Sequence, residues 1–228
     1  MEGERFAGDK KVGESYLGQW EKKFVKRSIR YIPSWLETYH LTLLTLLWSL
    51  LALVFFGLAN WNLHWLWAVS LMILLQYLTD LFDGAIGRHR DTGLVKWGFH
   101  MDHFLDYVFQ SIIVIGYYLM APDGLAHYFF GLLLLTGGYM VNSFLWFAAT
   151  NKFEISYFGV GPTEVRLLVI GMNASIVFIG TTWWSITVPL FFWAFLIGLI
   201  VLVFRTQAML WKIDMEAKQQ RVANVDQR

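Results

Sequence analysis

Four aspartates at helical spacing stand inside two apolar stretches of the chain: Asp80, Asp83, Asp102 and Asp106. Side chains three or four residues apart share one face of a helix, so the members of each pair should converge. A carboxylate near the middle of a membrane helix costs about 2.5 to 3.5 kcal/mol on insertion scales, so four of them require a compensating positive charge. The sequence contains no cysteine, and oxygen ligands without thiolates suit Mg²⁺ or Mn²⁺ better than Zn²⁺ or copper. We therefore predict that these aspartates bind a divalent cation.

We expect a short glycine- and arginine-bearing turn to join the two pairs, and this segment adds features of a phosphate site. Gly84 and Gly87 leave out side chains where a backbone or a ligand must approach closely, and Arg88 carries a forked set of donors that matches phosphate oxygens. A looser cluster, with Glu164 and Arg166, begins a later apolar stretch at the same expected membrane depth. These two residues either recognise phosphate or a headgroup, or take part in a catalytic hydrogen-bond network, or serve only helix capping and topology.

A simpler interpretation of the aspartates is that they cap helices or pair with Arg88, Arg90 and Lys96. That interpretation accounts for one or two carboxylates, but not for four at this spacing. For Arg90 and Lys96 themselves the simple role is favoured, because membrane topology requires basic residues beside a span.

The composition determines the class of protein that must position these residues. Hydrophobic residues make up 57% of the chain and charged residues 15%, which is too apolar for an ordinary soluble domain. Apolar stretches of about 20 residues can each cross the membrane as a helix. We predict an all-α polytopic membrane bundle of six transmembrane helices. The expected spans are residues 36–59, 63–82, 97–120, 125–149, 163–181 and 183–204.

The distribution of basic residues predicts the orientation of the bundle. Lys and Arg occur before the first span, in the second and fourth connections and in the tail, whereas the other three connections contain none. The positive-inside rule therefore places both termini and the site in the cytosol. Residues 16–32 alternate apolar and basic positions and predict an interfacial amphipathic helix, and no apolar core of a cleavable signal peptide precedes them. We divide the chain into a cytosolic segment with this helix (1–33), a membrane domain (34–206) and a cytosolic tail (207–228).

The pattern of residues resembles the signature of the CDP-alcohol phosphotransferase family, which is D-x2-D-G-x2-A-R-x8 or x9-G-x3-D-x3-D. The chain has Asp80, Asp83, Gly84, Gly87, Arg88, Gly98, Asp102 and Asp106 at these positions. Gly87 replaces the alanine of the pattern, and the smaller residue preserves close packing. The stretch LETYHLTLLTLLW is similar to the family's PNxLT opening, but Thr38 and Tyr39 replace Pro-Asn, which removes an expected contact to cytidine.

The resemblance implies an enzyme of phospholipid biosynthesis. In this family an acceptor hydroxyl attacks the β-phosphorus of a CDP-alcohol, either CDP-diacylglycerol or a CDP-aminoalcohol, and CMP is released. It implies two Mg²⁺ or Mn²⁺ ions, held mainly by Asp80, Asp83 and Asp102. Asp106 would be the general base and also touch metal. Contacts to the nucleotide diphosphate would come from Gly84 and Arg88, with Glu164 and Arg166 as further candidates.

The resemblance also implies the partners. One of the two substrates is a lipid, membrane lipids surround the domain, the protein forms a homodimer, and no nucleic acid is involved. We expect the cell membrane of a bacterium or archaeon. The alternative function is a divalent-cation transporter or channel, whose acidic residues would be distributed through the membrane depth. The observed aspartates cluster toward one face instead.

Overall fold

The computed structural model describes residues 10–12, 18–154 and 161–226. Within them the protein is all-α, as predicted, apart from one small pair of parallel strands, β1 (Lys10–Val12) and β2 (Lys152–Glu154). The helices and short 3₁₀ segments are α1 (Gly18–Ser28), η2 (Ile29–Tyr31), α2 (Thr38–Ala59), η3 (Leu63–Trp65), α3 (Leu66–Arg90), α4 (Val95–Leu119), α5 (Ala126–Thr150), α6 (Pro162–Ile179) and α7 (Trp184–Asp226).

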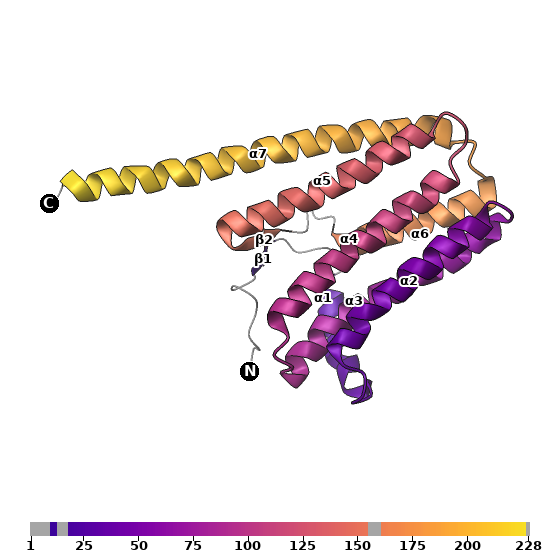
Figure 1. Ribbon diagram of the computed structural model, residues 1–228, viewed down its shortest axis with the longest axis horizontal. Helices are drawn as coiled ribbons and strands as arrows, with labels where there is room; N and C mark the ends of the chain where they lie inside the picture. The colour runs from indigo at the N-terminus through magenta and orange to yellow at the C-terminus, as the bar shows by residue number, and fades with distance from the viewer. Residues whose placement is uncertain (1–9, 13–17, 155–160, 227–228) are drawn as a thin grey trace.

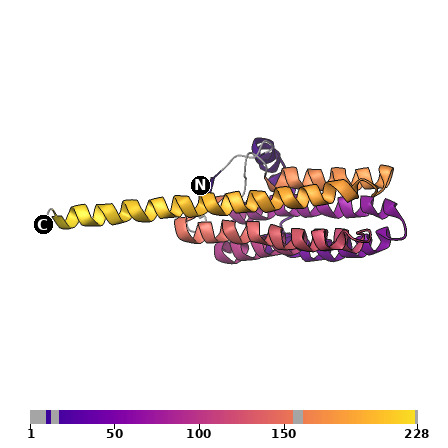
Figure 2. The same ribbon diagram turned by 90° about the horizontal axis from the view of Figure 1, so that it is seen from above.

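The long helices run side by side as a bundle (Figure 1). Helix α2 packs against both α3 and α4, while α3 and α4 touch each other much less. Helix α6 packs on the other side of α3, and α5 lies between α4 and α7. In Figure 2 α1 is seen nearly along its axis, whereas the bundle helices run across the view, so α1 crosses their direction. This orientation agrees with the predicted interfacial helix.

Five of the described helical segments are long and apolar enough to cross a membrane. They are Thr38–Ala59, Leu63–Arg90, Ala126–Thr150, Pro162–Ile179 and Trp184–Asn224. Helix α4 has 25 residues, as α3 and α5 do, but its first half contains Asp102, Asp106 and two histidines, which lower its hydropathy. Multiple membrane helices are therefore confirmed, and the count of six stays a prediction.

Two expected boundaries were wrong. The second span was predicted to end at residue 82, before a glycine-rich turn, but α3 continues to Arg90. Gly84, Gly87 and Arg88 are therefore helical, and the chain reverses only at Asp91 and Gly93, whose φ angles are 50° and 69°. The last span was predicted to end at residue 204, but α7 continues to Asp226, and it extends past the other helices (Figure 2).

At the end of the bundle that lies farther from the aspartates, a buried polar contact and a tight helix crossing hold the helices together. Asn173 of α6 is fully buried, accepts a hydrogen bond from Tyr117 Oη at 2.6 Å and donates to Ser70 Oγ at 3.0 Å. The ring of Phe56 on α2 lies where a Cβ at Gly116 on α4 would be. Helices α2, α3, α4 and α6 are thereby held in one arrangement, and this arrangement positions the site.

Candidate metal and phosphate site

Three of the four predicted carboxylates come together. One ligand oxygen from each of Asp80, Asp102 and Asp106 lies within 4.8 Å of the other two, and all three residues are partly buried. Asp102 and Asp106 share a face of α4 because they are four residues apart, and Asp80 meets them from α3. Three hard oxygen ligands from two helices fit the coordination chemistry of Mg²⁺ or Mn²⁺.

Asp83 is not part of this group of three, because α2 holds it. Its side chain is buried, with 6% exposure, and its Oδ2 accepts a hydrogen bond from Thr42 Oγ1 at 2.7 Å. Thr38 Oγ1, one turn earlier on α2, donates to the backbone oxygen of Asp83, also at 2.7 Å. Asp83 as a metal ligand therefore stays a prediction. The two threonines, in the stretch that departs from the family opening, fix this part of α3 against α2.

Arg166 of α6 extends into the carboxylate group. Its Nη2 donates to Asp80 Oδ2 at 2.8 Å and to Asp106 Oδ1 at 3.4 Å, and its side chain is 15% exposed. The Cζ atom lies 5.7 Å from the centre of the Tyr77 ring, within the range of a cation–π interaction. The sequence left three roles open for this residue: recognition of phosphate or a headgroup, a catalytic hydrogen-bond network, or topology. The contacts of Arg166 with two site aspartates fit the hydrogen-bond network best.

Glu164 has the simpler of its two predicted roles in the structure. Its Oε2 accepts a hydrogen bond from the backbone N–H of Gly161 at 2.8 Å. A glutamate at this position commonly satisfies an N–H group at a helix N-terminus. The contact therefore ties the start of α6, one turn from Arg166.

Gln76 is a site residue that sequence reasoning missed. Its side chain is 1% exposed, and its Nε2 donates to Asp106 Oδ1 at 2.9 Å. Among the described residues its Oε1 has no hydrogen-bond partner. The available signal was its position four residues before Asp80 in an apolar span, which puts both side chains on one face of α3.

Glu21 is a second missed residue, and it connects α1 to the site. Its Oε1 accepts hydrogen bonds from Tyr77 Oη at 3.0 Å and from Thr163 Oγ1 at 2.6 Å. Tyr77 belongs to α3 and Thr163 to the first turn of α6, so one carboxylate joins three helices. Because the Tyr77 ring also lies beside Arg166, α1 is connected to the carboxylate group through two side chains, Tyr77 and Arg166.

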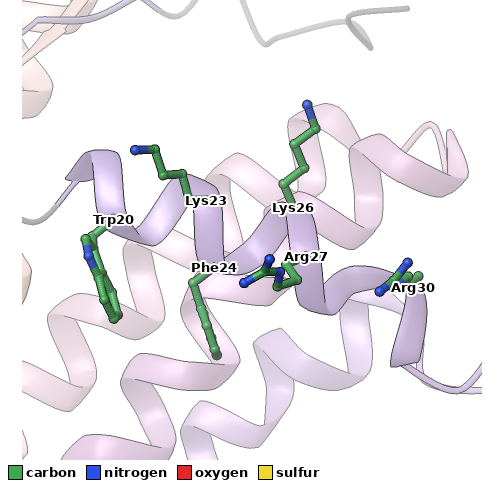
Figure 3. Close-up of a pocket in the computed structure, with 6 residues that line it drawn as sticks. All are labelled: Trp20, Lys23, Phe24, Lys26, Arg27 and Arg30. Carbon is green, nitrogen blue, oxygen red and sulfur yellow. The ribbon is translucent and has the colours of Figure 1, made fainter.

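The outer surface of α1 carries the amphipathic pattern that the sequence predicted. In Figure 3 Trp20 and Phe24 point to one side of the helix and Lys23 and Lys26 to the other. The Phe24 ring lies 5.8 Å from the Phe82 ring of α3. A hollow along this helix is lined by Trp20, Lys23, Phe24, Lys26, Arg27 and Arg30.

The two glycines of the signature have different surroundings. A Cβ at Gly84 would lie 3.2 Å from Arg88 Nη1, so glycine leaves room for the guanidinium to fold back over α3. A Cβ at Gly87 would lie 3.4 Å from Thr38 Oγ1 and 3.6 Å from Thr92 Oγ1, which are ordinary contacts. The alanine of the family pattern would therefore fit at position 87.

Two residues near the aspartates have structural contacts. Arg90 donates to the backbone oxygens of Leu36 at 2.7 Å and Pro33 at 2.9 Å, which fixes the segment before α2 against the end of α3. His103 Nδ1 lies 3.2 Å from Asp102 Oδ2. The ring of His103 can thus orient one carboxylate of the group.

Comparison with known proteins agrees with this geometry. The family described as CDP-alcohol phosphatidyltransferase matches residues 35–211, which is most of the chain. The chain is also similar to the inner membrane protein YnjF of Escherichia coli (strain K12), with 34% identity over 105 residues. That alignment covers 46% of this chain and 44% of the relative, so it spans less than half of either protein. The chain belongs to the CDP-alcohol phosphatidyltransferase family, which comprises membrane transferases of phospholipid synthesis.

Proposed function

We propose that this protein transfers a substituted phosphate group from a CDP-alcohol to an acceptor hydroxyl and releases CMP. The donor is CDP-diacylglycerol or a CDP-aminoalcohol, and either the donor or the acceptor is a lipid. The observation that carries the proposal is the meeting of Asp80, Asp102 and Asp106 within 4.8 Å, in a chain whose family performs this class of reaction.

The proposed step forms one bond and breaks one. The acceptor oxygen bonds to the β-phosphorus, and the bond from that phosphorus to the oxygen bridging the two phosphates breaks, so CMP leaves with the bridging oxygen. The hydroxyl proton passes to Asp106. Both hydrogen bonds described at Asp106 end on Oδ1, so we assign Oδ2 as the proton acceptor.

The other aspartates hold the metal in this proposal. Asp80, Asp83 and Asp102 are assigned as ligands, with Asp106 at their edge, for two Mg²⁺ or Mn²⁺ ions. When bound, such ions neutralise charge on the phosphates and on departing CMP. Gln76 orients Asp106 through its hydrogen bond at 2.9 Å.

Arg88 and Gly84 are assigned to the nucleotide diphosphate. A guanidinium binds phosphate oxygens as a fork, and Gly84 gives the Arg88 side chain the space in which it now lies. Glu164 and Arg166 stay candidates for the same role. Their described contacts favour roles within the protein instead. Glu164 accepts a hydrogen bond at the start of α6, and Arg166 donates to Asp80.

The proposal includes six spans, a site that opens to the cytosol of a bacterial or archaeal cell, and a homodimer. Alternation of connections that contain Lys or Arg with connections that contain neither supports the orientation. The turn between α3 and α4 and the C-terminal part of α7 lie at the same end of the bundle (Figure 1), as that orientation requires.

The direct test supplies purified protein with CDP-diacylglycerol or CDP-choline, Mg²⁺ or Mn²⁺, and a panel of alcohol and lipid acceptors. We expect CMP and one phosphodiester product to be formed in equal amounts with one donor class. The proposal fails if neither donor yields CMP. Metal uptake by protein-containing vesicles without CMP release would favour a transporter instead.

A further inference from the structure

Arg166 places a positive charge among the carboxylates that are proposed to bind metal. Its Nη2 contacts two of the three clustered aspartates, at 2.8 Å to Asp80 Oδ2 and 3.4 Å to Asp106 Oδ1. The guanidinium engages one oxygen of each of these two carboxylates, and those oxygens are then less available to a divalent cation. A cation bound among the same carboxylates would also be repelled by the positive charge of the guanidinium.

The three negative charges of the cluster require a nearby positive charge even without a bound metal ion. Three carboxylates with oxygens within 4.8 Å repel one another. The side chains of Asp80 and Asp106 are only 22% and 32% exposed, so water screens this repulsion incompletely. Arg166 offsets it with charge-assisted hydrogen bonds.

Neighbouring helices hold Arg166 in this position. The Tyr77 ring flanks the guanidinium, with 5.7 Å between Cζ and the ring centre. Glu21 joins Tyr77 to Thr163, three residues before Arg166 on α6. Arg166 thus lies just after the first turn of α6, and its guanidinium lies beside a tyrosine of α3. Both that first turn and that tyrosine are hydrogen-bonded to Glu21 of α1.

We propose that Arg166 is an internal counter-cation of the aspartate cluster that competes with the divalent metal. In the metal-free protein it holds Asp80 and Asp106 together, and a metal ion must displace it from them. Arg166 therefore lowers the affinity for metal and stabilises the metal-free protein. This inference rests on the proposed function only in taking the aspartates as metal ligands.

The test measures Mn²⁺ binding to the full chain in detergent, without nucleotide or acceptor. The loss of the free Mn²⁺ signal in electron paramagnetic resonance reports the bound fraction. Arg166→Gln should tighten Mn²⁺ binding by roughly tenfold, or about 1.4 kcal/mol. Lys96→Gln is the control, because it removes one exposed charge near the start of α4, and it should leave the affinity unchanged.

Thermal unfolding gives a second readout. With chelator present, Arg166→Gln should lower the Tm, and Mn²⁺ should raise the Tm of the variant more than that of the natural protein. If Arg166→Gln fails to fold, Arg166→Lys is used instead. Its shorter side chain holds the two aspartates less closely, so it should also bind Mn²⁺ more tightly than the natural protein.

The outcomes separate this inference from the proposed function. Equal or weaker Mn²⁺ binding by the Arg166 variants overturns the counter-cation role, even if the natural protein releases CMP. Tighter binding by the variants without CMP release from any donor supports the inference and removes the proposed reaction. If neither the natural protein nor the variants bind Mn²⁺, the metal site and the inference both fail.

Discussion

Asp106 combines two features that suit a general base. Its Oδ1 is fixed by Gln76 at 2.9 Å, and the residue sits with two other carboxylates. Asp106→Asn keeps the shape of the side chain but removes its capacity to accept a proton. We expect CMP release to fall by about 10²- to 10⁴-fold, while binding of the CDP donor stays detectable by calorimetry. Near-normal turnover would contradict the base assignment.

Gly84 and Gly87 offer a matched pair of alanine substitutions in one helix. Gly84→Ala brings a methyl group to 3.2 Å from Arg88 Nη1, so the guanidinium must move. Gly87→Ala adds only ordinary contacts. We expect Gly84→Ala to raise the KM for the CDP donor several-fold and Gly87→Ala to change it less than about twofold. Equal effects of the two variants would argue against a nucleotide contact from Arg88.

At the residue scale the sequence predicted which side chains belong to the site better than it predicted which side chains contact one another. The spacing of Asp102 and Asp106 on one helix required a shared face, and the structure has it. Arg166 was singled out, but its contacts with Asp80 and Asp106 depend on how α6 is rotated against α3. No spacing within one helix determines how two helices are rotated against each other. The contacts of Arg166 with the aspartates and of Glu21 with Tyr77 and Thr163 could therefore not be predicted from the sequence.

At the scale of elements, α1 is joined to the membrane bundle by a polar contact as well as an apolar one. Glu21 accepts from Tyr77 and Thr163, and Phe24 lies against Phe82. Glu21→Ala removes the oxygen that accepts both hydrogen bonds, so the two hydroxyl groups must find other partners. We expect faster hydrogen exchange across residues 18–28 with unchanged protection of the spans. The neighbouring exposed Lys22 supplies the control, Lys22→Ala, which should leave exchange unchanged. The same exchange rates in both variants would show that Glu21 does not dock α1.

The sequence predicted where helices lie better than where they end. The starts of five spans were located within about two residues, because long apolar stretches have few alternatives in a membrane. Residues 207–228 were assigned as a cytosolic tail. This segment contains the good helix formers Ala, Gln, Lys, Arg and Glu, and α7 continues through it to Asp226. The segment with Gly84, Gly87 and Arg88 was likewise expected to be a turn, although α3 includes it.

At the scale of the whole molecule, the orientation in the membrane follows from charged connections and can be tested with single cysteines. The chain contains no cysteine, so each introduced thiol reports alone. His89→Cys lies at the exposed end of α3, and Asp123→Cys lies in the exposed connection between α4 and α5. With a membrane-impermeant maleimide and intact cells, we expect labelling at position 123 only. Labelling at position 89 only would invert the topology, and labelling of both would contradict the span count between them.

The central claim is that aspartates from two membrane helices hold the metal that the transfer reaction requires. The most direct measurement is a Mn²⁺ titration of CMP release by the natural protein and by Asp80→Ala. We expect no CMP in chelator, restoration by Mn²⁺, and either loss of activity or a Mn²⁺ requirement raised by at least about tenfold in the variant, since one of three clustered ligands is removed. An unchanged Mn²⁺ dependence in Asp80→Ala, or full CMP release in chelator, would contradict the account.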